Sequence, residues 1–166
     1  MNRSGLGATA LRFAGAVGTI GLIIAGGFSA GAIAAPKTPK KHAFTATLTG
    51  AQISSQGTSF ETVYKDVSSL DGTGAGIQDG TLAGTAFPVS GKASFTGYFA
   101  NGVEKTADTF KLGAPNASGI SAITGSGKCA GGTGVHKSRK CAYTFTGTYN
   151  TKTTLTKVKI TGTYTS

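Results

Sequence analysis

The chain has no tryptophan, only two cysteines, and six acidic residues against sixteen lysines and arginines. The missing tryptophan and the closely spaced cysteines argue against an immunoglobulin-type sandwich, in which a disulfide links two sheets beside a buried tryptophan. Two cysteines and two histidines also offer too few ligands at suitable spacing for a zinc site. Helical periodicity is absent after residue 34, and the alternation of apolar and polar residues there predicts an all-β domain.

The N-terminus has the pattern of a bacterial-type export signal. Arg3 and Arg12 precede an uncharged run of apolar and small residues, which ends in an Ala-x-Ala cleavage motif at 32–34. We therefore expect residues 1–34 to be a signal peptide and the protein to be secreted. An uncleaved anchor is the alternative, since about 20 apolar residues span a bilayer. Residues 35–42 hold two prolines and three lysines and are predicted to be a disordered basic lead-in.

The remaining residues, 43–166, are predicted to form one β domain. Asn101-Gly102 lies between two alternating runs and is typical of a two-residue hairpin turn. An apolar residue followed by Thr-Gly recurs at uneven spacing, with the glycines at Gly50, Gly97, Gly125, Gly147 and Gly162. Glycine inside a strand marks a bulge, a bend or a close backbone approach, and closed barrels need such positions. We predict a small closed antiparallel β-barrel of about eight strands, with a β-sandwich as the alternative.

The two cysteines flank a short loop that is rich in glycine and basic residues. Because the protein is expected to be exported, we predict a structural disulfide between Cys129 and Cys141 rather than a catalytic thiol. Such a bridge contributes about 3 kcal/mol in the chain-entropy model. His136 lies in this loop beside Lys137 and Arg139, with no carboxylate or nucleophile nearby in sequence. We therefore expect an exposed loop histidine without a catalytic role.

The run GSGKCAGGTG at 125–134, followed by the alternating strand YTFTG at 143–147, resembles the late-strand signature of the allene oxide cyclase-like barrels. Plant dirigent proteins share this signature. The resemblance covers Ile123–Gly147 well and Ile77–Tyr164 loosely. It implies an eight-stranded antiparallel barrel with an apolar interior, often assembled as homo-trimers. The plant cyclases close an unsaturated epoxide into a cyclopentenone, and dirigent proteins steer the coupling of phenoxy radicals.

This chain departs from the dirigent pattern after the glycine turn. Val135-His136 and Arg139-Lys140-Cys141 stand where an aromatic residue and Ala-Arg-Gly usually follow. None of the six acids is matched to the catalytic carboxylate of the cyclases. The resemblance therefore implies the fold, and the activity does not follow from it.

Aromatic residues at alternating strand positions either fill a small barrel or line a ligand pocket. The candidate ligand-binding residues are Phe95, Phe99, Tyr143 and Phe145. The acids Glu61, Asp66, Asp71 and Asp79 include candidates for an acid–base pair across a barrel mouth. A carboxylate inside an apolar barrel would be a credible general acid or base. For Glu61 we expect the alternative, a solvent-facing side chain, because charged groups are mostly exposed.

Basic residues dominate the second half of the domain. From Thr109 onward there are seven lysines, one arginine and no acid. This asymmetry indicates either a polyanionic partner or simply a secreted barrel with a basic face. The candidate polyanion-binding residues are Lys137, Arg139 and Lys140, together with Lys128, Lys152, Lys157 and Lys159. We expect no specific nucleic acid, because single-strand binding needs aromatic side chains on an exposed basic face.

From the sequence we therefore predict a secreted, non-catalytic β-barrel that binds a small apolar ligand or a surface partner. One alternative is an allene oxide cyclase-like isomerase acting on a lipid-derived substrate. The other alternative is a polyanion-binding module. No cofactor or metal is predicted, and the ligand is not identified.

Overall fold

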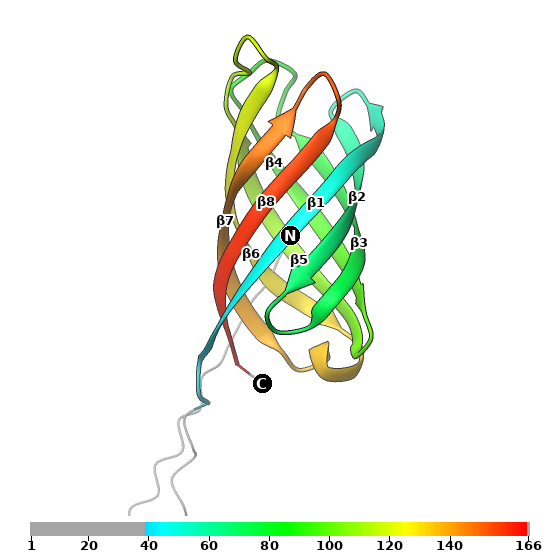
Figure 1. Cartoon of the computed structure of the whole chain (residues 1–166), viewed down its shortest axis with the longest axis vertical. Helices are drawn as coiled ribbons and strands as arrows, with labels where there is room; N and C mark the ends of the chain where they lie inside the picture. Colours follow the sequence, from blue (N-terminus) through cyan, green and yellow to red (C-terminus); the bar gives the residue numbers. More distant parts are fainter. Residues whose placement is uncertain (1–38, 166) are drawn as a thin grey trace, which may run out of the picture. The chain divides into compact units, whose positions relative to one another are not determined.

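The computed structural model describes residues 39–165 and shows a closed antiparallel barrel of eight strands (Figure 1). The predicted signal peptide and most of the lead-in lie outside the described residues. The strands are β1 (His42–Gln56), β2 (Ser59–Ser68), β3 (Gly72–Leu82), β4 (Val89–Phe99), β5 (Gly102–Leu112), β6 (Ile120–Gly132), β7 (Lys140–Asn150) and β8 (Leu155–Thr165). Consecutive strands pair, and β1 pairs with β8 to close the barrel. The predicted barrel is confirmed, and the sandwich alternative is excluded.

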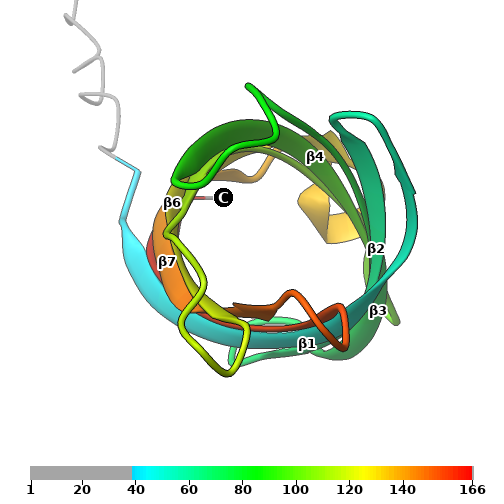
Figure 2. The same ribbon diagram turned by 90° about the horizontal axis from the view of Figure 1, so that it is seen from above.

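The two ends of the barrel carry different connections. One end of the barrel, which we call the plugged end, carries the β2–β3 turn, the β4–β5 turn and the β6–β7 loop. The opposite end, which we call the far end, carries the other four connections, at 57–58, 83–88, 113–119 and 151–154. The β6–β7 loop contains a short 3-10 helix, η1 (Gly134–His136). Viewed along the barrel, η1 lies within the ring of strands (Figure 2). This loop therefore covers the plugged end.

Alternation along the strands, interrupted by a register shift in β1 and another in the β5–β6 pairing, separates the interior from a polar exterior. Phe60, Thr62 and Tyr64 point inward, and threonines, serines and lysines dominate the outside. The buried apolar core comprises Ala46, Leu48, Tyr64, Val89, Phe95, Phe110, Leu112, Ile123, Phe145 and Val158. Among residues 39–165, no helix has the length and hydropathy needed to cross a membrane.

Inward-facing glycines make room for aromatic rings from neighbouring strands. A Cβ atom on Gly76 would collide with the ring of Phe95, and one on Gly91 would collide with the ring of Phe110. At each of the five glycines of the Thr-Gly triplets, a Cβ atom would lie less than 3.0 Å from a neighbouring atom, so the recurrence reflects close packing, one of the causes predicted for it. Because the rings lie against the backbone of the barrel wall, they leave space along the barrel axis.

The predicted disulfide is confirmed. Cys129 at the end of β6 is bonded to Cys141 at the start of β7, with their Cα atoms 5.0 Å apart. The bridge joins the two strands that carry the η1 loop, and it is compatible with an extracellular protein.

Candidate functional site in the barrel interior

A cavity of about 210 Å³ lies inside the barrel. Its lining extends from Phe87 in the β3–β4 connection at the far end to Arg139 at the plugged end. All four aromatic residues predicted to bind a ligand, Phe95, Phe99, Tyr143 and Phe145, line it. Ligand pockets for drug-sized molecules occupy about 300–1,000 Å³, so this cavity suits a smaller molecule.

The far half of the cavity is mainly apolar, with polar groups from Gln52, Ser55, Thr58 and Ser59 towards its end. Its walls are formed by core residues near the far ends of the strands, namely Phe60, Leu82, Phe110, Leu112, Ile123 and Val158. Phe60 and Phe110 meet edge to face, with ring centroids 5.8 Å apart. An apolar portion of a ligand would be accommodated here.

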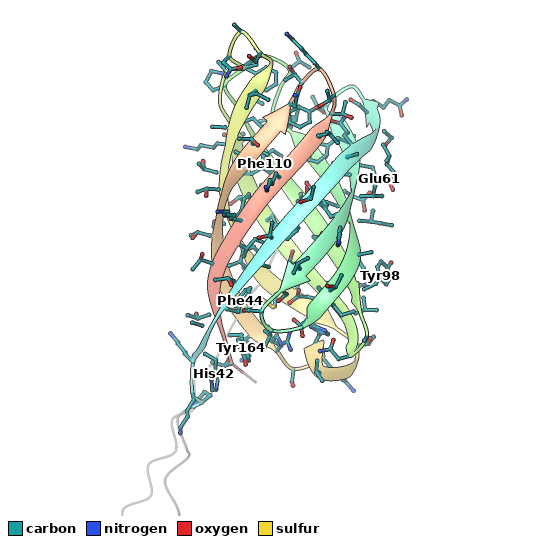
Figure 3. All side chains as sticks on the ribbon, in the orientation of Figure 1. His42, Phe44, Glu61, Tyr98, Phe110 and Tyr164 are labelled. Atoms are coloured by element: carbon teal, nitrogen blue, oxygen red, sulfur yellow. A yellow bond between two sulfur atoms is a disulfide. The ribbon has the colours of Figure 1, made fainter. Side chains whose placement is uncertain are left out.

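The plugged half is acidic. Of the six acids in the chain, four line the cavity: Asp66, Asp71, Glu104 and Asp108. The side chains of the other two, Glu61 and Asp79, are on the outer face, where these residues pair across β2 and β3; Figure 3 shows Glu61 pointing away from the barrel. The expectation that Glu61 faces solvent is confirmed.

Asp108 is held by a chain of hydrogen bonds. The hydroxyl of Tyr143 donates to Asp108 Oδ1 at 2.6 Å, and the side-chain amide of Gln78 donates to Oδ2 at 3.5 Å. Gln78 in turn accepts a hydrogen bond from Tyr64 at 3.1 Å. Burial is the main cause of a raised pKa at Asp108, and these donors oppose it.

Asp66 is buried without such support. Its exposed fraction is 4%, and its Oδ1 atom has no hydrogen-bond partner among the described residues. Burial, together with the nearby charge of Asp71, raises the pKa of Asp66 to about 7. Burial also raises the pKa of Glu104 to about 7, where Asp71 adds to the effect and Arg139 opposes it. Two carboxyl groups of the cavity therefore titrate close to neutral pH.

The η1 loop is fastened to the barrel by an ion pair. Arg139 donates from Nη1 to Asp71 Oδ2 at 2.6 Å and from Nη2 to Asp71 Oδ1 at 3.1 Å. Two parallel hydrogen bonds of this kind are the strongest arrangement for a guanidinium and a carboxylate. The guanidinium also lies 5.4 Å from the centroid of the Tyr164 ring.

His136 completes this network, and the expectation that it is exposed is wrong. It is 1% exposed, and its ring stacks on Phe99 with centroids 5.7 Å apart. Its Nδ1 atom lies 3.0 Å from Arg139 Nη1, and its Nε2 atom lies 3.2 Å from Asn101 Oδ1. Because a guanidinium only donates, Nδ1 accepts and Nε2 carries the hydrogen. Burial is the main cause of the lowered pKa of His136, so the ring is neutral.

Two clusters near the plugged end contain potential metal ligands. Asp71, Glu104 and His136 lie close together, but the Arg139 guanidinium bonds to two of them and occupies the position of a cation. Glu104 also lies close to the two cysteines, whose sulfur atoms are bonded to each other and so are not thiolate ligands. Neither cluster has the free donor set that a metal ion requires.

The predicted polyanion-binding residues do not gather at one place. Arg139 was expected to be among them, but it is 8% exposed and neutralised by Asp71. Lys137 and Lys140 are exposed at the plugged end, whereas Lys152 belongs to the β7–β8 turn at the far end. The basic loop is therefore chiefly a cover for the barrel, with two free lysines on its surface.

The inward position of Glu104 and Asp108 was not predicted from the sequence, and Asp66 was named only among the candidate acids for a barrel mouth. The alternation of inward and outward residues along β2 and β5 could have indicated these positions. Asp66 follows Thr62 and Tyr64 at intervals of two, and Glu104 and Asp108 share their parity with Phe110. The expected rarity of buried charge outweighed this pattern.

Comparison of the chain with protein-family models, with curated proteins and with solved structures finds no match.

Proposed function

We propose that the protein is a secreted, non-catalytic barrel that binds a small amphipathic ligand in its interior. The observation that carries this proposal is the division of one cavity into an aromatic, apolar half and a half that contains a buried, unpartnered carboxyl group on Asp66. Ligand sites commonly combine apolar walls with a few fixed polar groups.

The buried carboxyl group supports binding rather than a purely structural interior. A buried polar atom that lacks a partner costs about 1–3 kcal/mol, and more when it is charged. Nothing in the described chain offsets this cost at Asp66 Oδ1. By contrast, Tyr64, Gln78 and Tyr143 are already fixed by hydrogen bonds around Asp108. A ligand would therefore meet an ordered polar wall in which the buried oxygen Asp66 Oδ1 has no donor from the described residues.

Secretion and a relationship to the allene oxide cyclase-like barrels remain part of the proposal. The disulfide supports an oxidising compartment, and the N-terminal export pattern agrees with it. The glycine-rich signature at 125–134 and the closed eight-stranded barrel support the relationship.

One observation favours a second candidate, an isomerase. Asp66 and Glu104 face the cavity with pKa values of about 7. A carboxyl group that titrates near the working pH is suited to general acid–base catalysis, because both protonation states are populated. An isomerisation that moves a proton within a bound, lipid-derived molecule would use such a group, and it would be lost in Asp66→Asn.

Binding is tested by fluorescence titration with N-phenyl-1-naphthylamine, an apolar probe that brightens in dry surroundings. We expect saturable brightening with the natural protein. Val158→Phe fills the cavity from β8 and should weaken probe binding about tenfold or more, since one lost contact of about 1.4 kcal/mol is a factor of ten. Val67→Phe places the same side chain on the outside of β2, where the valine is 48% exposed, and should leave binding unchanged.

The absence of saturable binding by the natural protein would overturn the proposed function. Circular dichroism shows whether each variant keeps its β structure. If Val158→Phe does not fold, Ala46→Leu provides a smaller filling of the same cavity, because Ala46 also lines it.

A further inference from the structure

We infer that the ligand is a small apolar amine whose ammonium group binds at Asp66 while its hydrocarbon part lies among the aromatic rings of the far half. This inference rests on the proposed function and adds the chemical class of the ligand to it.

The charge of the cavity is opposite to the charge of the protein. The chain has a formal net charge of +10, with sixteen basic and six acidic residues. The cavity, however, is lined by four acids and by one basic residue, Arg139, and no lysine contributes to its described wall. The interior therefore favours a cation, even though the whole molecule would attract anions.

Two buried polar atoms of the cavity wall have no hydrogen-bond partner among the described residues, Asp66 Oδ1 and Arg139 Nε. Arg139 is committed to Asp71 through two hydrogen bonds. Asp108 accepts hydrogen bonds from Tyr143, Gln78 and Thr106. Asp66 Oδ1 has no donor among the described residues, although Asp66 is buried, with an exposed fraction of only 4%. A ligand that enters the cavity would find this oxygen as its free acceptor.

An ammonium group fits this acceptor better than the other polar end groups. A carboxylate or phosphate would be repelled by Asp66, Glu104 and Asp108, and the charge of Arg139, the one basic residue of the cavity wall, is already balanced by Asp71. A hydroxyl group would donate one hydrogen bond but would leave the charge of the cavity unbalanced. An ammonium group supplies both a donor and a positive charge, and hydrogen bonds between charged groups are about twice as strong as neutral ones.

The surroundings favour an organic cation over a metal ion. Among the described residues, the oxygens of Asp66, Glu104 and Asp108 do not form a trio within 4.8 Å of one another. Next to Asp66 along the inner face of β2 is Tyr64, whose ring packs edge to face on Phe95 with centroids 6.2 Å apart. Aromatic faces attract organic cations, whereas hard metal ions need converging oxygen ligands.

The inference predicts that binding releases protons. Burial raises the pKa of both Asp66 and Glu104 to about 7, so both are partly protonated at neutral pH. An ammonium ion binds the ionised form and so displaces a proton. The other ionisable groups around Asp66 and Glu104 are Asp71, Asp108, Arg139, Tyr143 and His136, whose Nδ1 atom lies 3.9 Å from Glu104 Oε1. Amine affinity should therefore rise between pH 6 and pH 8, while the affinity for a neutral ligand of the same length should not.

Three probes of equal chain length test the inference: octylamine, octanol and octanoate, each measured by calorimetry and by displacement of N-phenyl-1-naphthylamine at pH 8. We expect octylamine to bind at least about tenfold more tightly than octanol, because one charge-assisted hydrogen bond changes the affinity by about this factor. Octanoate should bind most weakly of the three. Asp66→Asn should abolish the difference between octylamine and octanol. Asp79→Asn, a matched change on the outer face, should preserve it.

The outcomes separate the inference from the proposed function. If the naphthylamine probe binds but octanol competes as well as octylamine, or if none of the three displaces it, the amine assignment is overturned and the binding function stands. If the probe itself does not bind, both fail. If Asp66→Asn does not fold, the pH dependence of the natural protein decides, and an octylamine affinity that does not rise relative to that of octanol between pH 6 and pH 8 would overturn the inference.

Discussion

The two halves of the barrel interior are filled by different kinds of side chain. In the far half, apolar rings lie on glycines of neighbouring strands, and Ser121 is fully buried with no hydrogen-bond partner among the described residues. In the plugged half, charged and polar groups are joined by hydrogen bonds that centre on Arg139 and on Asp108. The same strand alternation thus supports an apolar and an ionic interior. The difference shows that this barrel holds buried charge at the plugged end, where the β6–β7 loop supplies a partner for Asp71 and other strands supply partners for Asp108.

Arg139→Ala should have the largest effect. The change leaves Asp71 and His136 without the guanidinium that they share, and breaking a buried ion pair costs about 3–5 kcal/mol. We expect the free energy of unfolding in urea to fall by this amount. Lys137→Ala in the same loop is exposed and should change it by less than about 0.5 kcal/mol. A loss below about 1 kcal/mol for Arg139→Ala would show that the ion pair does not hold the plug.

Asp66→Asn should have a smaller effect that depends on pH. The pKa of Asp66 is raised from 3.8 to about 7, so the folded protein binds more protons than the unfolded chain between these values. Its contribution to stability is therefore greatest below pH 4 and is lost as the pH rises through 7. Without ligand, the variant should be more stable than the natural protein at pH 8 by about 2–4 kcal/mol and equal to it near pH 4.

Urea titrations at the two pH values check this, with Asp79→Asn on the outer face as the matched control. An equal difference at both pH values would contradict a buried carboxyl group that titrates near neutrality.

Ser121→Ala should have the smallest effect, with the opposite sign to that of Arg139→Ala. The serine is 0% exposed, and its hydroxyl has no partner, so removing the hydroxyl removes a desolvation cost. We expect a gain of up to about 1 kcal/mol, measured by thermal unfolding. Ser94→Ala on the outer face of β4 should be neutral. A clear loss of stability in Ser121→Ala would mean that the far half also depends on buried polar contacts.

The closed barrel and the disulfide were both predictable from the sequence. Alternation with a period of two assigns Phe95, Tyr143 and Phe145 to the inner face, because side chains of a strand point to opposite sides in turn. Cys129 and Cys141 lie near each other in sequence, so an antiparallel pairing brings them together. These features depend on local spacing alone. The same rule would have placed Asp66 and Asp108 inside, had it been applied to the acids.

The network at the plugged end was not predictable in this way. Arg139 and Asp71 are separated by 68 positions, and they meet only because the β2–β3 turn and the β6–β7 loop lie at the same end of the barrel. The burial of His136 has the same origin, since Asn101 comes from the β4–β5 turn.

The sequence by itself determined which residues share a face, since alternation follows from the geometry of a single strand. Closure of the barrel decided the rest, because it joined β1 to β8 and brought turns distant in sequence to one end. Closure also turned four acids of a basic protein toward one cavity. Whether a charged group is buried, and whether it has a hydrogen-bond or ion-pair partner, depends on neighbours from other strands. Only the tertiary structure supplies those neighbours.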